Sequence, residues 1–187
     1  MKVCTVLRGR ATPESERHTL DAVISPHDLE DTYLPAFRKL VVDAHAGSIM
    51  CAYNSVDGAP ACANEMLLQQ KLKQDWHFAG YVVSDCAAIT DVAAGHKFAP
   101  DLSHAAATSL KAGTDLSCGK EYAALVDAVQ QGLVSEADID AAVKRLFTAR
   151  FRLGMFDPGP SVPYFVDSRR ICTGPIRPDG SRGEVAV

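Results

Sequence analysis

Tyr81-Val82-Val83-Ser84-Asp85 is a short apolar run that ends in a serine and a carboxylate, and Gly80 precedes it. A run of this length bounded by turn residues is typical of a buried strand in a parallel sheet. In folds built from β/α units, the carboxyl ends of such strands carry the active site. The stretch therefore predicts an α/β fold with Asp85 at the functional edge. Asp is also a favoured helix N-cap, and these residues alone do not separate the two interpretations.

Residues 47–54 form a second strand-like segment, Gly-Ser-Ile-Met-Cys-Ala-Tyr-Asn. The turn residues Asp57-Gly58-Ala59-Pro60 follow it, and residues 63–75 then place apolar side chains at helical spacing. Strand, helix and strand in this order predict one β/α unit. Its two strands bring Tyr53 and Asp85 to the same edge of the sheet.

This ordered pattern resembles the catalytic barrel of glycoside hydrolase family 3, in particular its β-xylosidase-like and β-glucosidase-like bacterial members. The resemblance rests on a strand ending in Tyr-Asn, a Gly-x-Pro turn, a helix, Trp-x-Phe-x-Gly and Val-Ser-Asp, and it extends over residues 13–158. It implies an α/β fold that is part of a TIM-type (β/α) barrel, namely its C-terminal half, with irregular ends. A complete barrel typically needs about 250 residues, more than the 187 of this chain.

The resemblance also implies a reaction, the hydrolysis of O-glycosyl bonds with retention of anomeric configuration. Such enzymes use a nucleophilic carboxylate and a second carboxyl group as acid/base. Position in the family motif makes Asp85 the nucleophile and places Tyr53 beside it. The alternative for Tyr53 is a core tyrosine whose hydroxyl has found a partner. The expected partner is a small-molecule or oligosaccharide β-glycoside, and no cofactor is implied.

Three further residues are candidates for substrate binding. Cys86 stands where many family β-glucosidases carry Trp and where the xylosidase-like and arabinosidase-like branch carries Cys, which favours pentose substrates. A Cys86 nucleophile with a histidine base lacks any local signature of a cysteine protease. Arg17 and His18 match the xylosidase-like pattern and are expected to face the sugar. An ordinary polar turn before a helix is the alternative for both.

Two features of the family's active site, the acid/base residue and a sugar-binding Lys-His pair, have no counterpart in the sequence. The resemblance implies an acid/base from a later region, and no glutamate matches its motif; Glu121 and Glu136 lie on predicted helices and are expected to be solvated or capping. Thr5-Val6 stands where the family has a sugar-binding Lys-His pair. These gaps suggest a truncated or frame-disrupted gene product, or a wrong gene boundary. Residues 1–12 are a divergent segment, residues 13–158 the partial barrel, and residues 159–187, rich in Pro, Gly and Arg, a disordered or loosely packed tail.

Local signals predict the remaining elements. Ser25 is expected to cap a helix with Pro26 at its first position, and Ser135 to begin the last helix through a capping box. The other predicted segments are a continuation of the first helix to residue 46, with a pause at Pro35, a helix over 103–112, a short strand over 114–117, and helices over 122–131 and from 135 towards 151.

Composition limits the classes of partner. The chain is 47% hydrophobic and 22% charged with a formal charge of −4, which does not suggest nucleic acid or an anionic membrane. No apolar run approaches the roughly 20 residues of a membrane span. The N-terminus makes a poor signal peptide, so the localisation stays open.

Cysteine and histidine spacing gives no sign of a metal site, because C-x-x-C and H-E-x-x-H motifs are absent. The six cysteines are expected to be reduced thiols, with a Cys51–Cys62 bridge as the alternative in an oxidising compartment. His96 and His104 are interpreted as surface or capping residues.

Two functions follow as hypotheses. The first is a β-xylosidase-type or β-glucosidase-type glycosidase, of which this chain is a fragment, and the alternative is an inactive remnant or weak sugar-binding module. A nucleic-acid module built on the last helices and the basic tail is disfavoured by the acidic net charge.

Overall fold

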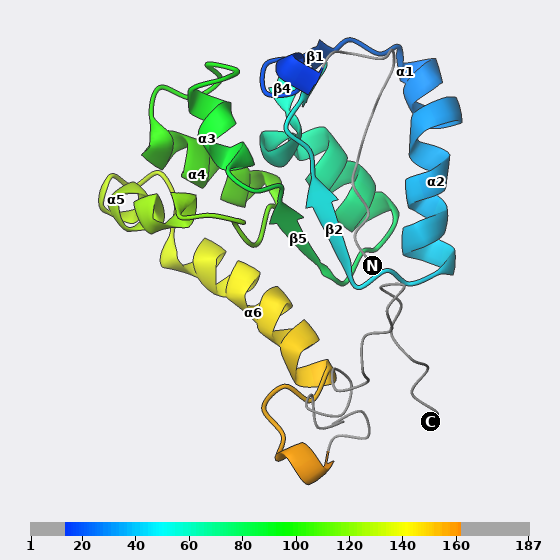
Figure 1. Ribbon diagram of the computed structural model, residues 1–187, viewed down its shortest axis with the longest axis vertical. Coiled ribbons are helices and arrows are strands. Elements are labelled where there is room, and N and C mark those ends of the chain that lie inside the picture. Colours follow the sequence, from blue (N-terminus) through cyan, green and yellow to red (C-terminus); the bar gives the residue numbers. More distant parts are fainter. Residues whose placement is uncertain (1–13, 162–187) are drawn as a thin grey trace, which may run out of the picture. The chain divides into compact units, whose positions relative to one another are not determined.

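The computed structural model describes residues 14–161 (Figure 1). The chain divides into two compact units, Met1–Ala149 and Arg150–Val187, which are described separately. The predicted divergent segment 1–12 and residues 162–187 of the predicted tail lie outside the described residues. In the described part of the chain, no helix is long and apolar enough to cross a membrane.

Two short parallel strands, β2 (Ser48–Cys51) and β5 (Tyr81–Ser84), lie side by side at the centre of the first unit (Figure 1). Their register pairs Ile49 with Val82 and Cys51 with Ser84, so these four side chains lie on one face of the sheet. Val82 and Ser84 are fully buried there. Both predicted strands are thus confirmed, and the order strand, helix, strand is that of a β/α unit.

Helix η5 (Met66–Asp75) connects the two strands and buries Leu67, Leu68 and Leu72 in the core that covers them. It follows a 3₁₀ turn, η4 (Ala61–Ala63). The Asn64 side chain accepts the Leu67 N–H at 3.0 Å, satisfying one of the amides that a helix start leaves without a partner. The predicted helix over 63–75 is therefore present, although it begins after this turn.

The first helical stretch consists of α1 (Pro26–Asp28), η2 (Leu29–Tyr33), α2 (Leu34–Arg38) and η3 (Lys39–Asp43) in direct succession. Ser25 is its N-cap, as predicted: the Asp28 N–H donates to Ser25 Oγ at 3.0 Å. The helix continues through Pro35, where the hydrogen-bonding pattern changes from wide i→i+5 turns to α-helical turns. Its buried residues Leu29, Leu34 and Val41 join the core that covers β2.

A second, smaller sheet was not predicted. It has the order β1 (Asp21–Ala22), β3 (Ser55–Val56), β4 (Ala59–Pro60), with β1 parallel and β4 antiparallel to β3. Asp57 and Gly58 form the hairpin turn, and both have positive φ, 51° and 83°. Asp-Gly is a favoured pair for such a turn because Gly adopts positive φ without steric cost.

The remaining helices of the first unit form a second core. They are α3 (Ala88–Ala93), α4 (Leu102–Ala112), η6 (Glu121–Ala124), α5 (Leu125–Gln130) and α6 (Glu136–Arg152), the last of which runs into the second unit. Residues that contribute to this core include Ile89, Val92, Ala105, Leu110 and Ala128. The capping box of α6 is confirmed: Ser135 N–H donates to Asp138 Oδ2 at 2.9 Å, and Asp138 N–H donates to Ser135 Oγ at 3.3 Å.

The predicted strand over 114–117 is reduced to a single parallel bridge between Val83 and Leu116. The Asp115 carboxylate accepts the Val82 N–H at 2.9 Å. In a regular parallel ladder, the Val82 N–H would donate to a main-chain carbonyl, but here it donates to the Asp115 side chain. The segment therefore lies along β5 without extending the ladder.

The second unit is described from residue 150 to 161 and contains the end of α6 and the 3₁₀ turn η7 (Gly159–Ser161). Gly154, at φ 67°, stops the helix. Its N–H donates to the Phe151 carbonyl at 2.9 Å and the Met155 N–H to the Arg150 carbonyl at 3.1 Å, a Schellman arrangement. The predicted termination at Leu153-Gly154 is thus confirmed.

Candidate active site

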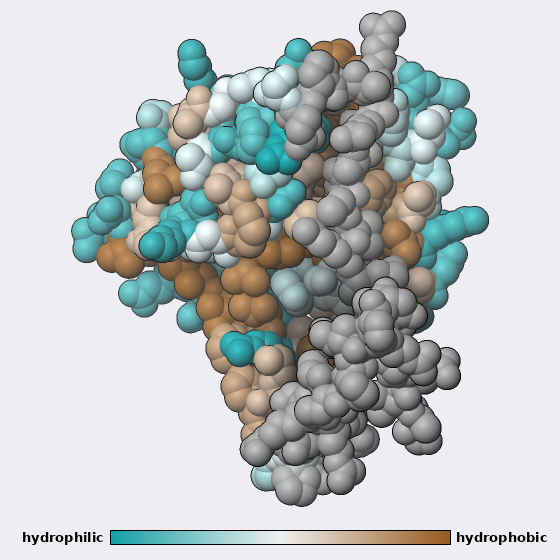
Figure 2. All heavy atoms as spheres, in the orientation of Figure 1, coloured by the Kyte–Doolittle hydropathy of each residue, from teal (hydrophilic) through white to brown (hydrophobic). Residues whose placement is uncertain are grey.

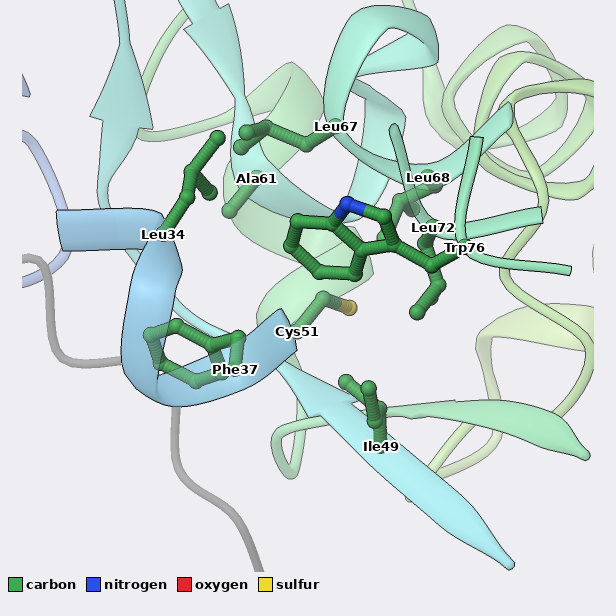
Figure 3. A pocket seen from close by; sticks show the side chains of 9 residues that line it. All are labelled: Leu34, Phe37, Ile49, Cys51, Ala61, Leu67, Leu68, Leu72 and Trp76. Carbon is green, nitrogen blue, oxygen red and sulfur yellow. The ribbon is translucent and has the colours of Figure 1, made fainter. Parts of the chain in front are cut away.

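One pocket of the first unit is lined almost entirely by apolar groups (Figure 3). It encloses about 40 Å³ between the first helical stretch, β2 and η5. Its lining residues are Leu34, Phe37, Ile49, Cys51, Ala61, Leu67, Leu68, Leu72 and Trp76. A sugar needs hydrogen-bonding groups for its hydroxyls, which such a lining does not offer. The polar end of β5 is therefore the better candidate for a sugar site.

Asp85 lies directly after β5, and the sheet holds its main chain. Its N–H donates to the Cys51 carbonyl at 3.0 Å, so the pairing of β2 with β5 extends to this residue. The carboxylate Oδ1 accepts the Cys86 N–H at 2.8 Å. The N-cap of the following helix α3 is Ala87, in a left-handed conformation at φ 65°. The Asp85 carboxylate does not cap α3.

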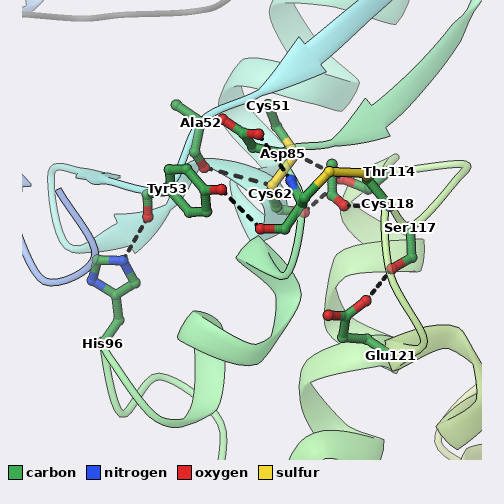
Figure 4. Close-up of a disulfide and its surroundings, with 12 residues drawn as sticks. Cys51, Ala52, Tyr53, Cys62, Asp85, His96, Thr114, Ser117, Cys118 and Glu121 are labelled. Carbon is green, nitrogen blue, oxygen red and sulfur yellow. Dashed lines mark hydrogen bonds between the residues drawn. A yellow bond between two sulfur atoms is a disulfide. The ribbon is translucent and has the colours of Figure 1, made fainter.

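Tyr53 follows β2 by two residues and lies beside Asp85. Its hydroxyl donates to the main-chain carbonyl of Cys86 at 2.8 Å (Figure 4). Partial burial, and then the negative charge of Asp85, raise the pKa of the Tyr53 phenol above its usual value. Both effects favour the neutral phenol, so Tyr53 remains a hydrogen-bond donor beside the carboxylate.

Arg17 and His18 lie against the ring of Tyr53. The Arg17 guanidinium carbon is 4.9 Å from the ring centroid, and the His18 and Tyr53 ring centroids are 4.5 Å apart. His18 Nδ1 donates to Asp91 Oδ2 at 2.6 Å, because its Nε2 accepts the Arg17 Nε–H at 3.0 Å. The structure thus brings three of the predicted substrate-binding residues together around one aromatic ring.

His96 contributes to the site in a way that sequence reasoning missed. Its Nε2 donates to the Tyr53 carbonyl at 2.7 Å, since a carbonyl only accepts, and its Nδ1 lies 2.9 Å from Ser55 Oγ. The prediction of an ordinary surface or capping residue is wrong for His96. The same prediction fits His104, whose main-chain N–H donates to the side chain of the N-cap residue Asp101 at 2.9 Å. The 43 positions between His96 and Tyr53 hide this contact from sequence analysis.

Four cysteines form disulfides, Cys51–Cys62 and Cys86–Cys118, with Cα–Cα distances of 5.1 and 4.4 Å. The prediction of reduced thiols is therefore wrong for these four, and the alternative Cys51–Cys62 bridge is present; Cys4 and Cys172 lie outside the described residues. The fold brings each pair within the range that a disulfide requires. Cys86 is exposed beside Asp85, whereas Cys51 and Cys62 are buried. As half of a disulfide, Cys86 carries no thiol nucleophile.

Glu121 also departs from the expectation of a solvated or capping residue. Only 7% of it is exposed. Its carboxylate accepts a hydrogen bond from Thr90 Oγ1 at 3.3 Å. It accepts a second one from Ser117 Oγ (Figure 4). Glu136, by contrast, is exposed in the first turn of α6, as predicted. Within residues 14–161, no group of three or more His, Cys, Asp or Glu side chains could hold a metal ion.

Comparison with known proteins decides the family. Residues 8–149 match the model of the glycosyl hydrolase family 3 N terminal domain. The chain belongs to glycoside hydrolase family 3. A probable exo-1,4-β-xylosidase of Aspergillus terreus is 42% identical over 154 residues, which are 80% of this chain and 20% of that protein. A xylan 1,4-β-xylosidase of Xylanibacter ruminicola is 44% identical over 148 residues, 78% of this chain and 17% of the relative.

Solved structures of family 3 enzymes share the fold. The exo-β-xylosidase XlnD, in complex with a xylobiose aziridine activity-based probe, matches with a TM-score of 0.77 at 39% identity, covering 80% of this chain and 20% of that one. A β-glucosidase of Listeria innocua, in complex with glucose, matches with a TM-score of 0.69 at 32% identity. The match covers 73% of this chain and 19% of the β-glucosidase chain. This family 3 chain thus spans about a fifth of the length of the relatives it matches.

Proposed function

We propose that this chain carries the nucleophile of a retaining β-glycosidase and that Asp85 is that nucleophile. The observation that supports this most is the place of Asp85 in a family 3 chain, at the carboxyl end of β5 and beside the Tyr53 phenol. Active sites of β/α folds lie at that end of the strands. The relatives named as xylosidases and β-glucosidases support β-linked xylosyl or glucosyl groups as the substrate class.

In the proposed reaction, the Asp85 carboxylate attacks the anomeric carbon, and the glycosidic oxygen leaves with a proton from a general acid. Water then hydrolyses the glycosyl-enzyme and releases Asp85. The Cys86 N–H donates to Oδ1 of the attacking carboxylate at 2.8 Å and so helps to orient it. The proposal assigns the acid/base to no residue of this chain.

The remaining predicted residues take supporting roles in the proposal. The Cys86–Cys118 disulfide, exposed at Cys86, would form a wall of the sugar site next to Asp85. A compact wall of this kind suits a pentose. Arg17 and His18, which contact the Tyr53 ring, would form another border of the sugar site. The fold proposal is the C-terminal half of a (β/α)₈ barrel, in which β2, β5 and the Leu116 bridge are successive strand positions.

A chimeric enzyme tests the proposal. The matching segment of the Aspergillus terreus relative is replaced by residues 14–158 of this chain, and hydrolysis of an aryl β-xyloside and an aryl β-glucoside is measured. We expect turnover in the chimera and a loss of at least about 10³-fold with Asp85→Asn, since the nucleophile is gone. Asp127→Asn, an exposed aspartate on α5, is the matched control.

Two outcomes would count against this function. Near-normal turnover of the Asp85→Asn chimera would remove Asp85 from the nucleophile role. An inactive chimera that folds and still binds xylobiose in calorimetry would favour the alternative, a sugar-binding module without catalysis.

A further inference from the structure

Glu121 is a buried carboxylate to which the proposed reaction gives no role. It begins helix η6 and is 7% exposed. Burying a carboxylate is costly unless hydrogen bonds compensate for the lost water. Here two hydroxyl donors do so, since Oε1 accepts from Thr90 and Oε2 from Ser117. A side chain that is costly to bury and is hydrogen-bonded at both carboxylate oxygens points to a specific role in this part of the fold.

The two donors lie on the two segments that adjoin Asp85. Thr90 is on α3, the helix that begins just after Asp85. Ser117 directly precedes Cys118, which is bonded through its sulfur to Cys86, the residue after Asp85. The Glu121 carboxylate therefore joins the helix after Asp85 to the loop that is cross-linked beside it. Figure 4 shows the hydrogen bond to Ser117 on that loop.

The loop that contains Cys118 is hydrogen-bonded to a residue before Asp85 and to a residue after it. The Cys118 N–H donates to Ser84 Oγ at 2.9 Å, and the Ala87 N–H donates to the Cys118 carbonyl at 2.9 Å. Together with the disulfide, these bonds hold Cys118 against residues 84, 86 and 87. The geometry of the turn that carries Asp85 thus depends on where Cys118 lies.

Gly119 leaves room for the Glu121 carboxylate. A Cβ at this position would come within 2.4 Å of Glu121 Oε2, and the residue has φ 154°, which L side chains rarely adopt. A glycine at this position therefore allows the carboxylate to approach the loop main chain closely.

We propose that Glu121 is a positioning residue for Asp85. By accepting from Thr90 and Ser117 together, it holds the Cys118 loop, and through Cys118 it sets the orientation of the Asp85 turn. The proposal rests on the nucleophile role proposed for Asp85. It predicts that Glu121 affects the turnover step rather than substrate affinity, because no contact of Glu121 with the sugar is involved.

The first test measures the reduction of the Cys51–Cys62 and Cys86–Cys118 disulfides in the chimera described above, which contains residues 14–158 of this chain. Dithiothreitol is added, and alkylated peptides are quantified by mass spectrometry for Glu121→Ala, Glu121→Gln and the exposed control Glu136→Ala. We expect Glu121→Ala to speed reduction of Cys86–Cys118 about tenfold, because hydrogen bonds to a charged group are lost from its loop. The buried Cys51–Cys62 bridge is the internal reference for global opening, and we expect no change in its rate.

The second test measures kinetics in the chimera described above. We expect Glu121→Ala to lower kcat on an aryl β-xyloside about tenfold with KM within about twofold, because a misplaced nucleophile slows chemistry without weakening binding. Glu121→Gln, which keeps one acceptor oxygen, should recover part of the loss, and Glu136→Ala should match the parent chimera.

Three results would overturn the proposal. They are equal acceleration of both disulfides, no acceleration of either, and an unchanged kcat in Glu121→Ala. If the parent chimera is inactive, the proposed glycosidase function fails, whereas the disulfide measurement still decides whether Glu121 holds the Cys118 loop.

Discussion

At the scale of single residues, Tyr53 contacts most of the other residues of the candidate site. Its ring contacts Arg17 and His18, its hydroxyl donates to the Cys86 carbonyl, and its carbonyl accepts from His96. Three segments distant from Tyr53 in the sequence thus meet at this one residue. An aromatic ring with a polar end suits this position, because the ring packs while the hydroxyl stays bonded.

Removing the Tyr53 hydroxyl should lower turnover more than stability. Tyr53→Phe keeps the ring contacts and loses the hydrogen bond to Cys86 as well as the donor beside Asp85. We expect kcat of the chimera on an aryl β-xyloside to fall about tenfold, the effect of one hydrogen bond of roughly 1.4 kcal/mol. Tyr81→Phe on β5 is the control. Equal losses in both variants would contradict a specific role for the Tyr53 hydroxyl.

At the scale of secondary-structure elements, a buried ionic network holds helices to the sheet. The Asp115 side chain is fully buried and accepts from Val82 N–H on β5, from Arg145 Nε on α6 at 2.8 Å, and from Lys73 Nζ on η5 at 3.3 Å. Burial lowers the pKa of Lys73, and the Asp115 charge opposes that shift. One carboxylate thus connects β5, η5 and α6.

Neutralising this carboxylate should destabilise the fold strongly. Asp115→Asn leaves Lys73 and Arg145 close to each other without a counter-charge, and breaking such a buried network costs about 3–5 kcal/mol. We expect a corresponding drop in the free energy of unfolding, measured by urea titration followed by circular dichroism. The exposed Asp127→Asn should stay within about 0.5 kcal/mol of the parent. A loss below about 1 kcal/mol for Asp115→Asn would show that the network matters little for stability.

At the scale of the whole molecule, apolar side chains remain at the surface. On α6, Val143 is 45% exposed and Phe147 is 36% exposed, one turn apart. Figure 2 shows hydrophobic residues at the surface over the region that Figure 1 labels α6. Among the described strands, β2 pairs only with β5, so one of its edges has no strand partner among residues 14–161. Such edges and patches favour association.

We expect the isolated 187-residue chain to be poorly soluble or loosely packed. Light scattering during gel filtration should show aggregates that grow with concentration, and a hydrophobic dye should bind the protein. Val143→Lys should increase the soluble fraction relative to Ala149→Lys at the end of the same helix. A monomer with a sharp, cooperative melting transition would contradict this prediction.

The isolated chain is also expected to show no glycosidase activity. A positioned proton donor typically contributes about 10²- to 10⁴-fold, and substrate positioning contributes a further large term. A dinitrophenyl β-xyloside bypasses the need for the acid but not for positioning, so we expect no burst of phenol. Asp85→Asn is the matched control. A stoichiometric burst, with mass spectrometry locating the sugar on Asp85, would show that this half of the site is assembled on its own.

The sequence by itself determined the features that depend on neighbouring residues. The Ser25 cap, the Ser135 capping box, the termination at Gly154 and the two strands follow from local hydrogen bonding and apolar spacing, which a short window of sequence contains. The ordered motifs from the Tyr53 strand to Asp85 indicated the family that the comparisons show.

Only the tertiary structure decided which distant side chains meet. The pairing of Cys86 with Cys118 spans 32 positions, and the contact of His96 with Tyr53 spans 43. The burial of Glu121, expected in solvent, depends in part on the donor Thr90, which the fold brings to it from 31 positions away. A disulfide or a buried polar contact depends on distance in space, and the packing of helices on the β2–β5 pair sets that distance.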